Sequence, residues 1–192
     1  MKVIGLTGGI GSGKTTVLKI FEKFGCLVYN SDLRAKTIQN SCKKAIESIK
    51  QFFGEDIYQE GILQRKKLAD IVFKQPEKLK QLEKIVHPLV FEDFEKFCQD
   101  NKTKEFIILE SAVLIESGFY KYTDFLVLVT ALQEKCIERV IKRDNISRVQ
   151  VLERMSKQMN DFQRKEFCKY IIENNEMQTL DNQVLQILNK ER

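Results

Sequence analysis

The chain lacks the features that would indicate a membrane, secreted or disulfide-built protein. Its 192 residues contain no apolar run long enough to cross a bilayer, and residues 1–7 lack the apolar core of a signal peptide. The five cysteines are odd in number, scattered and free of any C-x-x-C pair, which argues against a disulfide framework and a zinc site. These absences favour a reducing, cytoplasmic location.

A concentrated basic stripe is missing as well. The formal net charge is +5, but the lysines are interleaved with acidic residues along helical stretches. Nucleic-acid binding would need clustered basic residues together with residues that read bases, so we expect neither a nucleic-acid nor a membrane partner. The modest positive excess would still help to attract a polyanionic small molecule.

What the chain does contain is a glycine-rich loop close to its start. Residues 8–15 read G-G-I-G-S-G-K-T, which matches the G-x-x-x-x-G-K-T loop that wraps nucleotide phosphates. An apolar run precedes the loop and apolar residues at helical spacing follow it, so the alternative, a simple turn before a helix, explains less. We expect the nucleotide to contact Gly9, Ile10, Gly11, Ser12, Gly13, Lys14, Thr15 and Thr16.

Two side chains of this loop have a predicted chemical role. The glycines and the helix N-terminus would present N–H groups to phosphate oxygens. Lys14 would bridge the outer phosphates, and the hydroxyl of Thr15 would ligate Mg²⁺, which prefers hard oxygen ligands shared with the nucleotide. ATP or GTP is therefore the first ligand to consider, with Mg²⁺ as its companion.

Five short strand-like runs alternate with helical sequence, which is typical of a parallel sheet covered by helices. The segment between the second and third runs has helical periodicity and predicts a helical insertion over residues 33–102. In it Pro76 is placed to open a helix, and Pro88 to end or kink one. A second charged stretch with few apolar residues, 143–167, predicts a mobile lid. The predicted strands cover residues 2–6, 26–29, 106–109, 125–129 and 170–172.

Several residues outside the loop are candidates for phosphoryl-transfer chemistry. Asp32 follows the second strand and is either a general base or the N-cap of the next helix. Arg139 and Arg143 are one helical turn apart, so both can serve the phosphates, although for the pair taken alone an exposed charged helix is the better explanation.

Two further candidates for the site, His87 and Glu110, could also have purely structural roles. His87 is the sole histidine and lies before Pro88, where it is either structural or a contact for a substrate phosphate or ribose. Glu110 follows the third strand, where P-loop enzymes often keep an acid near Mg²⁺, but a carboxylate at a strand end can also be a plain turn residue.

Taken together, these segments resemble the dephospho-CoA kinase family over essentially the whole chain. The phosphate loop matches the family even at the variable positions of the motif, and the other segments follow in the family's order. They are residues 3–16, 61–65, 82–88 with their L-x-x-x-x-H-P pattern, 113–116, Arg143-Asp144 with Ser147-Arg148, Arg154-x-x-x-Gln158, and 171–175.

The resemblance implies an α/β, three-layer P-loop kinase fold with a five-stranded parallel sheet, a helical acceptor-binding insertion and a helical lid. It implies ATP-dependent phosphorylation of the ribose 3′-hydroxyl of dephospho-CoA, the last step of CoA synthesis. We expect the protein to be a monomer or weak homo-oligomer. The core would comprise residues 1–32, 103–142 and 168–192. The implied catalytic residues are Asp32, Lys14 and Arg143; ATP would contact Arg139, Arg143, Asn174 and Asn175; the acceptor would contact Asp32, Arg65, His87 and Glu110.

The chain departs from the family pattern at two places. Asn30-Ser31-Asp32 stands where the family usually has D-A-D, so an amide replaces the first acid and cannot supply negative charge. Glu110 and Ala112 stand where the family commonly has Asp and Pro. We expect these departures to tune the site.

Two other functions compete with this interpretation. Another small-molecule P-loop kinase, acting on a nucleoside, a sugar or a shikimate-like alcohol, would share the core and differ in the insertion. A GTPase-like switch would need a D-x-x-G element and an N-K-x-D or T-K-x-D guanine reader, and the sequence has none of these.

Overall fold

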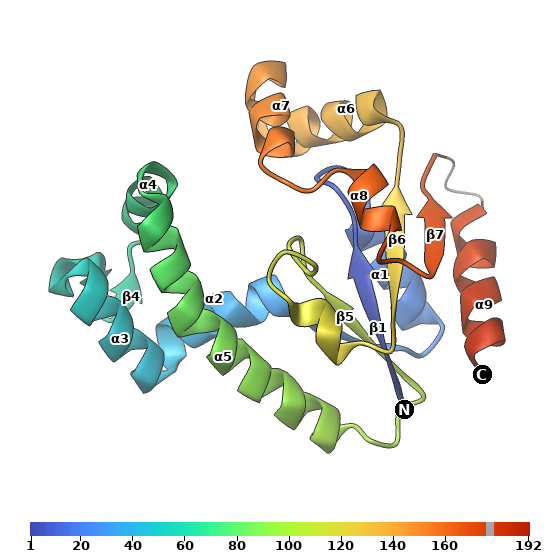
Figure 1. The fold of residues 1–192 in the computed structure, drawn as a ribbon, viewed down its shortest axis with the longest axis horizontal. Helices are drawn as coiled ribbons and strands as arrows, with labels where there is room; N and C mark the ends of the chain where they lie inside the picture. The colour runs from blue at the N-terminus through green and yellow to red at the C-terminus, as the bar shows by residue number, and fades with distance from the viewer. Residues whose placement is uncertain (176–178) are drawn as a thin grey trace. The chain divides into compact units, whose positions relative to one another are not determined.

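The computed structural model describes residues 1–175 and 179–192 (Figure 1). The chain forms two compact units. The first unit comprises Met1–Asn30 and Lys102–Arg192, and the second unit comprises Ser31–Asn101.

The first unit is built on a five-stranded parallel sheet, which confirms the predicted sheet. Its strands are buried apolar runs, as expected where both faces of a parallel sheet are covered. The strand order is β2-β5-β1-β6-β7, with β1 in the centre. The bounds are β1 Lys2–Thr7, β2 Leu27–Asn30, β5 Phe106–Glu110, β6 Phe125–Thr130 and β7 Tyr170–Glu173.

Helices α1 (Lys14–Lys23) and α9 (Leu180–Glu191) pack against each other and against one face of this sheet. Ile4 and Leu6 of β1 belong to the same buried cluster as Phe21 of α1 and Leu188 of α9. The opposite face of β1 carries Gly5, where an added Cβ would come within 2.9 Å of Leu114. Strand β1 is thus fixed from both sides, and so is the loop that follows it.

The remaining helices of the first unit follow β5 and β6. A short 3₁₀ helix, η2, covers Phe119–Tyr122, and α6 covers Gln133–Asp144. Helices α7 (Arg148–Ser156) and α8 (Asp161–Lys165) come next. Val151 of α7 packs against Ile137 and Val140 of α6, together with Ile10 of the phosphate loop.

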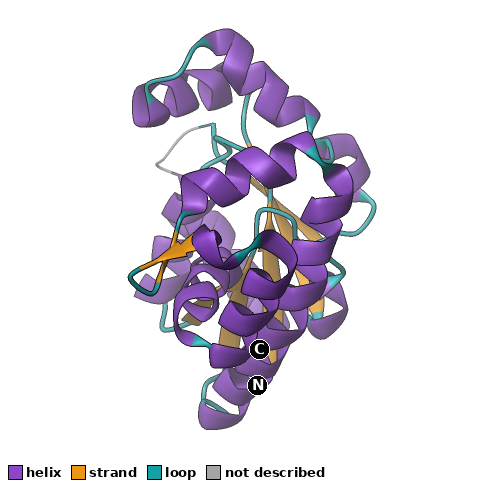
Figure 2. Ribbon diagram, turned by 90° about the vertical axis from the view of Figure 1, so that its left-hand side faces the viewer, coloured by secondary structure: helices purple, strands orange, loops and turns teal. Residues whose placement is uncertain are grey.

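The second unit is mainly helical, and α5 packs against its other three α-helices. A two-stranded antiparallel hairpin turns at Glu60 and Gly61, both with positive φ, and appears in orange among the purple helices of Figure 2. The sequence predicted the helices but not this hairpin. The bounds are α2 Ser31–Ser41, α3 Lys43–Phe53, η1 Glu55–Ile57, β3 Tyr58–Gln59, β4 Ile62–Leu63, α4 Arg65–Lys74 and α5 Pro76–Asp100.

Helix α5 corrects one expectation from the sequence. Pro76 opens the helix as predicted, but Pro88 lies inside it and does not end it. Proline costs the helix one backbone hydrogen bond, yet buried apolar residues, including Val86 and Val90, lie on both sides of position 88. Packing of this face sustains the helix, so His87 occupies a helix interior and not a helix end.

Candidate active site

The phosphate loop joins the end of β1 at Thr7 to the start of α1 at Lys14. Gly11 and Gly13 adopt φ values of 80° and 91°, which residues with a side chain rarely take. A Cβ on Gly13 would also lie 1.9 Å from Nδ2 of Asn174, and one on Gly11 would lie 2.4 Å from the carbonyl oxygen of Cys136. Both glycines are therefore required by conformation and by space.

Two side chains hold the loop's carbonyl groups from outside. Arg139 Nη1 donates to the carbonyl oxygens of Gly11 at 3.3 Å and Ser12 at 3.4 Å. The buried amide of Asn174 donates from Nδ2 to the Ser12 carbonyl at 2.8 Å, and the Asn174 carbonyl accepts from Arg139 Nη2 at 3.1 Å. With these carbonyls held, the loop can offer its N–H groups to an anion.

Lys14 extends back along the same loop. Its Nζ donates to the carbonyl oxygens of Gly8 at 2.8 Å and Gly9 at 3.4 Å. Thr15 and Thr16 occupy the first turn of α1, where the preceding Gly13 provides no side-chain cap. The N–H groups of this turn and the helix dipole favour a phosphate at this position.

The carboxyl ends of β2 and β5 bring together the two departures noted in the sequence. Asn30 pairs in register with Glu110, and its Nδ2 donates to Glu110 Oε2 at 2.6 Å. Glu110 is buried, with 6% of its surface exposed, and also pairs in register with Leu6 of β1. The amide of Asn30 thus lies beside the carboxylate of Glu110, at the end of the sheet from which the phosphate loop departs.

The two arginines of α6 have different partners. Arg139 contacts the phosphate loop, whereas Arg143 donates from Nε to Asp144 Oδ1 at 2.7 Å. Arg154 of α7 donates to the other oxygen of Asp144 at 2.8 Å. Hydrogen bonds from Arg143 and the positive charges of both arginines lower the pKa of Asp144. The helical spacing suggested one shared target, whereas Arg139 contacts the phosphate loop and Arg143 contacts Asp144.

Asn175 lies beside α6. Its Oδ1 accepts from the backbone N–H of Leu132 at 3.0 Å, and its carbonyl accepts from Lys135 Nζ at 2.6 Å. Asn174 and Asn175 therefore tie the end of β7 to the phosphate loop and to the start of α6, respectively.

The other sequence candidates, Asp32, Arg65 and His87, lie in the second unit. Helix α2 begins at Ser31, so Asp32 lies in its first turn and is exposed. Arg65 opens α4 and donates from Nη2 to the carbonyl of Lys36 at 3.0 Å. Burial lowers the pKa of His87, with Glu83 acting in the opposite direction. His87 is therefore mainly neutral at neutral pH.

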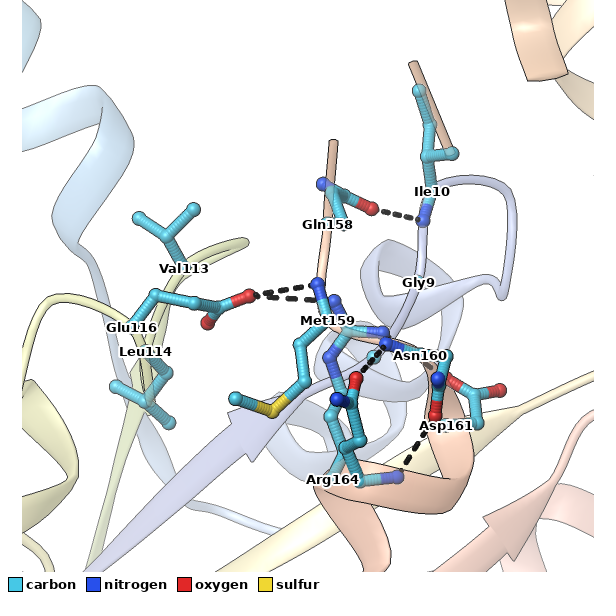
Figure 3. A network of polar contacts seen from close by, with 12 residues as sticks. Gly9, Ile10, Val113, Leu114, Glu116, Gln158, Met159, Asn160, Asp161 and Arg164 are labelled. Atoms are coloured by element: carbon cyan, nitrogen blue, oxygen red, sulfur yellow. Dashed lines mark hydrogen bonds and ion pairs between the residues drawn. The ribbon is translucent and has the colours of Figure 1, made fainter. Parts of the chain in front are cut away.

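Helix α8 and the segment before it make contacts with the phosphate loop that were not predicted from the sequence. Gln158 Oε1 accepts from the backbone N–H of Ile10 at 3.0 Å, and Arg164 of α8 is almost completely buried beside Gly9 (Figure 3). A sequence signal for the helix starts does exist, because Ser147 with Gln150 and Asn160 with Gln163 form capping boxes.

Among the described residues, no group of three or more His, Cys, Asp or Glu side chains could hold a metal ion. In the same residues, no helix is long and apolar enough to cross a membrane.

The fold is shared with several solved structures, and small-molecule kinases are among them. TT1252 from Thermus thermophilus matches with a TM-score of 0.89 and 31% identity, over 99% of this chain and 97% of that one. The dephospho-CoA kinase from Campylobacter jejuni matches with a TM-score of 0.71 and 23% identity, over 98% and 96%. Shikimate kinase from Acinetobacter baumannii matches with a TM-score of 0.55 and 20% identity, over 100% of this chain and 95% of that one. Together with the phosphate loop, this fold defines a P-loop kinase.

Sequence comparison narrows the class. The model of the dephospho-CoA kinase family matches residues 2–179. The dephospho-CoA kinase of Aquifex aeolicus is 39% identical over 175 residues, 91% of this chain and 89% of that protein. The dephospho-CoA kinase of Bacteroides fragilis is 35% identical over 185 residues, which are 96% of this chain and 90% of that protein. The chain belongs to the dephospho-CoA kinase family.

Proposed function

We propose that this chain transfers the γ-phosphoryl group of ATP to the 3′-hydroxyl of the ribose of dephospho-CoA, giving CoA and ADP. The observation that carries the proposal is the family match over residues 2–179, which includes a phosphate loop with every required residue in place. The braced carbonyls of Gly11 and Ser12 support nucleotide binding at this loop.

Each part of the chain has a proposed task. Residues 1–32, 103–142 and 168–192 form the nucleotide-binding core, residues 33–102 bind the acceptor, and residues 143–167 form the lid. Arg65 and His87 are proposed acceptor contacts. Neutral His87 would serve as a hydrogen-bonding group for ribose, because its buried ring disfavours the charged form.

The proposed chemistry is an in-line displacement. The 3′-oxygen attacks the γ-phosphorus, the bond from that phosphorus to the β,γ-bridging oxygen breaks, and the hydroxyl proton passes to Asp32. Lys14 neutralises charge on the outer phosphates, and Arg143 is expected to contribute from the lid side once nucleotide is bound. Arg139, Asn174 and Asn175 support the nucleotide site; for Arg139 and Asn174 this means holding the loop's carbonyls.

Mg²⁺ is the expected companion of ATP. Its fit rests on oxygen donors: the exposed hydroxyl of Thr15 at the start of α1 and the carboxylate of Glu110 at the end of β5. So few protein ligands suit a cation that keeps several waters and binds through phosphates. When bound, the ion would neutralise charge on the β- and γ-phosphates.

We further expect the enzyme to act in the cytoplasm as a monomer or a weak homo-oligomer, with no nucleic-acid or membrane partner. All five cysteines are free thiols. Burial raises the pKa of Cys26 to about 12 and that of Cys168 to about 11, so these thiols are protonated and unreactive at neutral pH.

The test is mass spectrometry of the acceptor. The purified protein is incubated with Mg·ATP and, separately, with dephospho-CoA, common nucleosides or shikimate, and Lys14→Ala serves as the blank. The proposal expects one added phosphate on dephospho-CoA alone, and none with the blank. A phosphate on another acceptor rejects the substrate, and no transfer to any acceptor rejects the kinase activity.

A further inference from the structure

A buried arginine in the lid has more hydrogen-bond donors than partners. Arg164 lies on α8 with 1% of its surface exposed. Its Nη1 donates to Asp161 Oδ1 at 3.1 Å, and its Nη2 lies 3.7 Å from Glu116 Oε1, an ion pair too long for a hydrogen bond (Figure 3). Among the residues that the structure describes, neither Nε nor Nη2 has a hydrogen-bond acceptor.

A purely structural role leaves this arrangement unexplained. The ion pair with Asp161, three residues earlier in the same helix, uses one nitrogen, but burying two further donors of a charged group without acceptors is costly. Each such group in a native protein needs an explanation, and a bound molecule that completes the site is one. The missing acceptors would have to be oxygen atoms of a bound molecule that can reach the guanidinium group.

The guanidinium lies at the phosphate loop. Arg164 Nη1 is 3.7 Å from the position that a Cβ on Gly9 would take. Arg164 also lines a cavity of about 440 Å³ together with Gly9, Ile10 and Ser12 of the loop. The hydrogen bond from the Ile10 N–H to Gln158 ties the segment that precedes α8 to the same loop.

The position along the loop indicates which phosphate is near. Lys14, the residue that reaches the outer phosphates of a bound nucleotide, contacts the carbonyls of Gly8 and Gly9. Arg164 lies at this same Gly9 end. Asn174 and Arg139 contact the other end, at Gly11, Ser12 and Gly13.

We propose that Arg164 binds the terminal phosphate of the nucleotide and so distinguishes ATP from ADP. The inference rests on the proposed function for the identity of the nucleotide. Two γ-phosphate oxygens would supply the acceptors that Nε and Nη2 lack, in the paired geometry that guanidinium and phosphate share. Asp161 holds the third nitrogen and orients the group.

The test measures the binding of two nucleotides by calorimetry, Mg²⁺ with a non-hydrolysable ATP analogue and Mg²⁺ with ADP. Arg164→Met should weaken binding of the ATP analogue by about tenfold or more, because charge-assisted hydrogen bonds are lost, and change ADP binding less than threefold. Arg164→Lys keeps the charge and should recover part of the loss. Lys165→Met removes an exposed charge from the next position of α8 and should leave both affinities unchanged.

Thermal unfolding of each variant separates binding from folding. If Arg164→Met does not fold, Arg164→Lys carries the test, and a selective loss for the ATP analogue supports the proposal. Equal losses for both nucleotides, or unchanged affinities, overturn it and leave Arg164 as an anchor of α8. Wild-type protein that binds neither nucleotide would instead reject the proposed function itself.

Discussion

Replacing Asn174 with alanine tests whether the phosphate loop is held in shape from behind. Among the described residues, the buried side chain makes one hydrogen bond, from Nδ2 to the Ser12 carbonyl at 2.8 Å. The backbone N–H of residue 174 donates to Thr130, and its carbonyl accepts from Arg139; alanine keeps both contacts. The substitution therefore removes one brace from the loop and little else.

The magnitude follows from the partners left behind. Losing a neutral hydrogen bond costs about 0.5–1.5 kcal/mol, and the Ser12 carbonyl then keeps a 3.4 Å contact with Arg139. Part of the cost is offset because Asn174 Oδ1, buried without a hydrogen-bond partner in the described structure, is removed as well. A net destabilisation of about 0.5–1 kcal/mol corresponds to a Tm lower by roughly 1–4 °C for a chain of this size.

The assay pairs thermal unfolding with ATP titration. Without this hydrogen bond, the loop conformation that binds phosphate becomes less stable relative to other loop conformations. If it lies about 1 kcal/mol above them, the apparent affinity for ATP falls about fivefold. Asn182→Ala, at an exposed position of α9, is the matched control and should change the free energy of unfolding by less than about 0.5 kcal/mol. A lower Tm with ATP affinity within twofold of wild type would refute the idea that Asn174 shapes the loop.

Two further predictions concern turnover and pH. Asp32→Asn should lower kcat by about 100-fold or more while ATP affinity stays unchanged, since a general base acts only on the transferred proton; unchanged turnover would remove Asp32 from that role. Glu191, with 6% of its surface exposed, accepts hydrogen bonds from Lys169 and Tyr170, which lower its pKa from 4.5 to about 2. The folded pKa is below the unfolded one, so this stabilisation is present above about pH 4.5 and is lost as the pH falls towards 2. Glu191→Gln should therefore flatten the dependence of Tm on pH across that window, and an unchanged slope would contradict the assignment.

The sheet and the phosphate loop could be predicted because their signals are local. Each strand of the parallel sheet is a short apolar run, and the loop's glycines, Lys14 and Thr15 must stand at fixed spacing. Register then follows from the fold, and it is register that brings Asn30 beside Glu110. The sequence showed that both residues depart from the family pattern, but not that they bond to each other.

The missed features depend on tertiary packing. Local rules allowed Pro88 to end its helix, whereas the packing of α5 against α2, α3 and α4 carries the helix through to Asp100. The hairpin of β3 and β4 has only two residues in each strand, too few for a periodic pattern. Arg164 lies in a charged stretch that resembles a solvated surface, and only the fold shows that it is buried.

The most direct test of the central claim is the position of the new phosphate. The product of dephospho-CoA and Mg·ATP is examined by phosphorus NMR with proton correlation. The account predicts one new phosphomonoester, coupled to the ribose H3′ proton and formed in equal amount with ADP. Coupling to H2′, or ADP formed without a new ester, would contradict it.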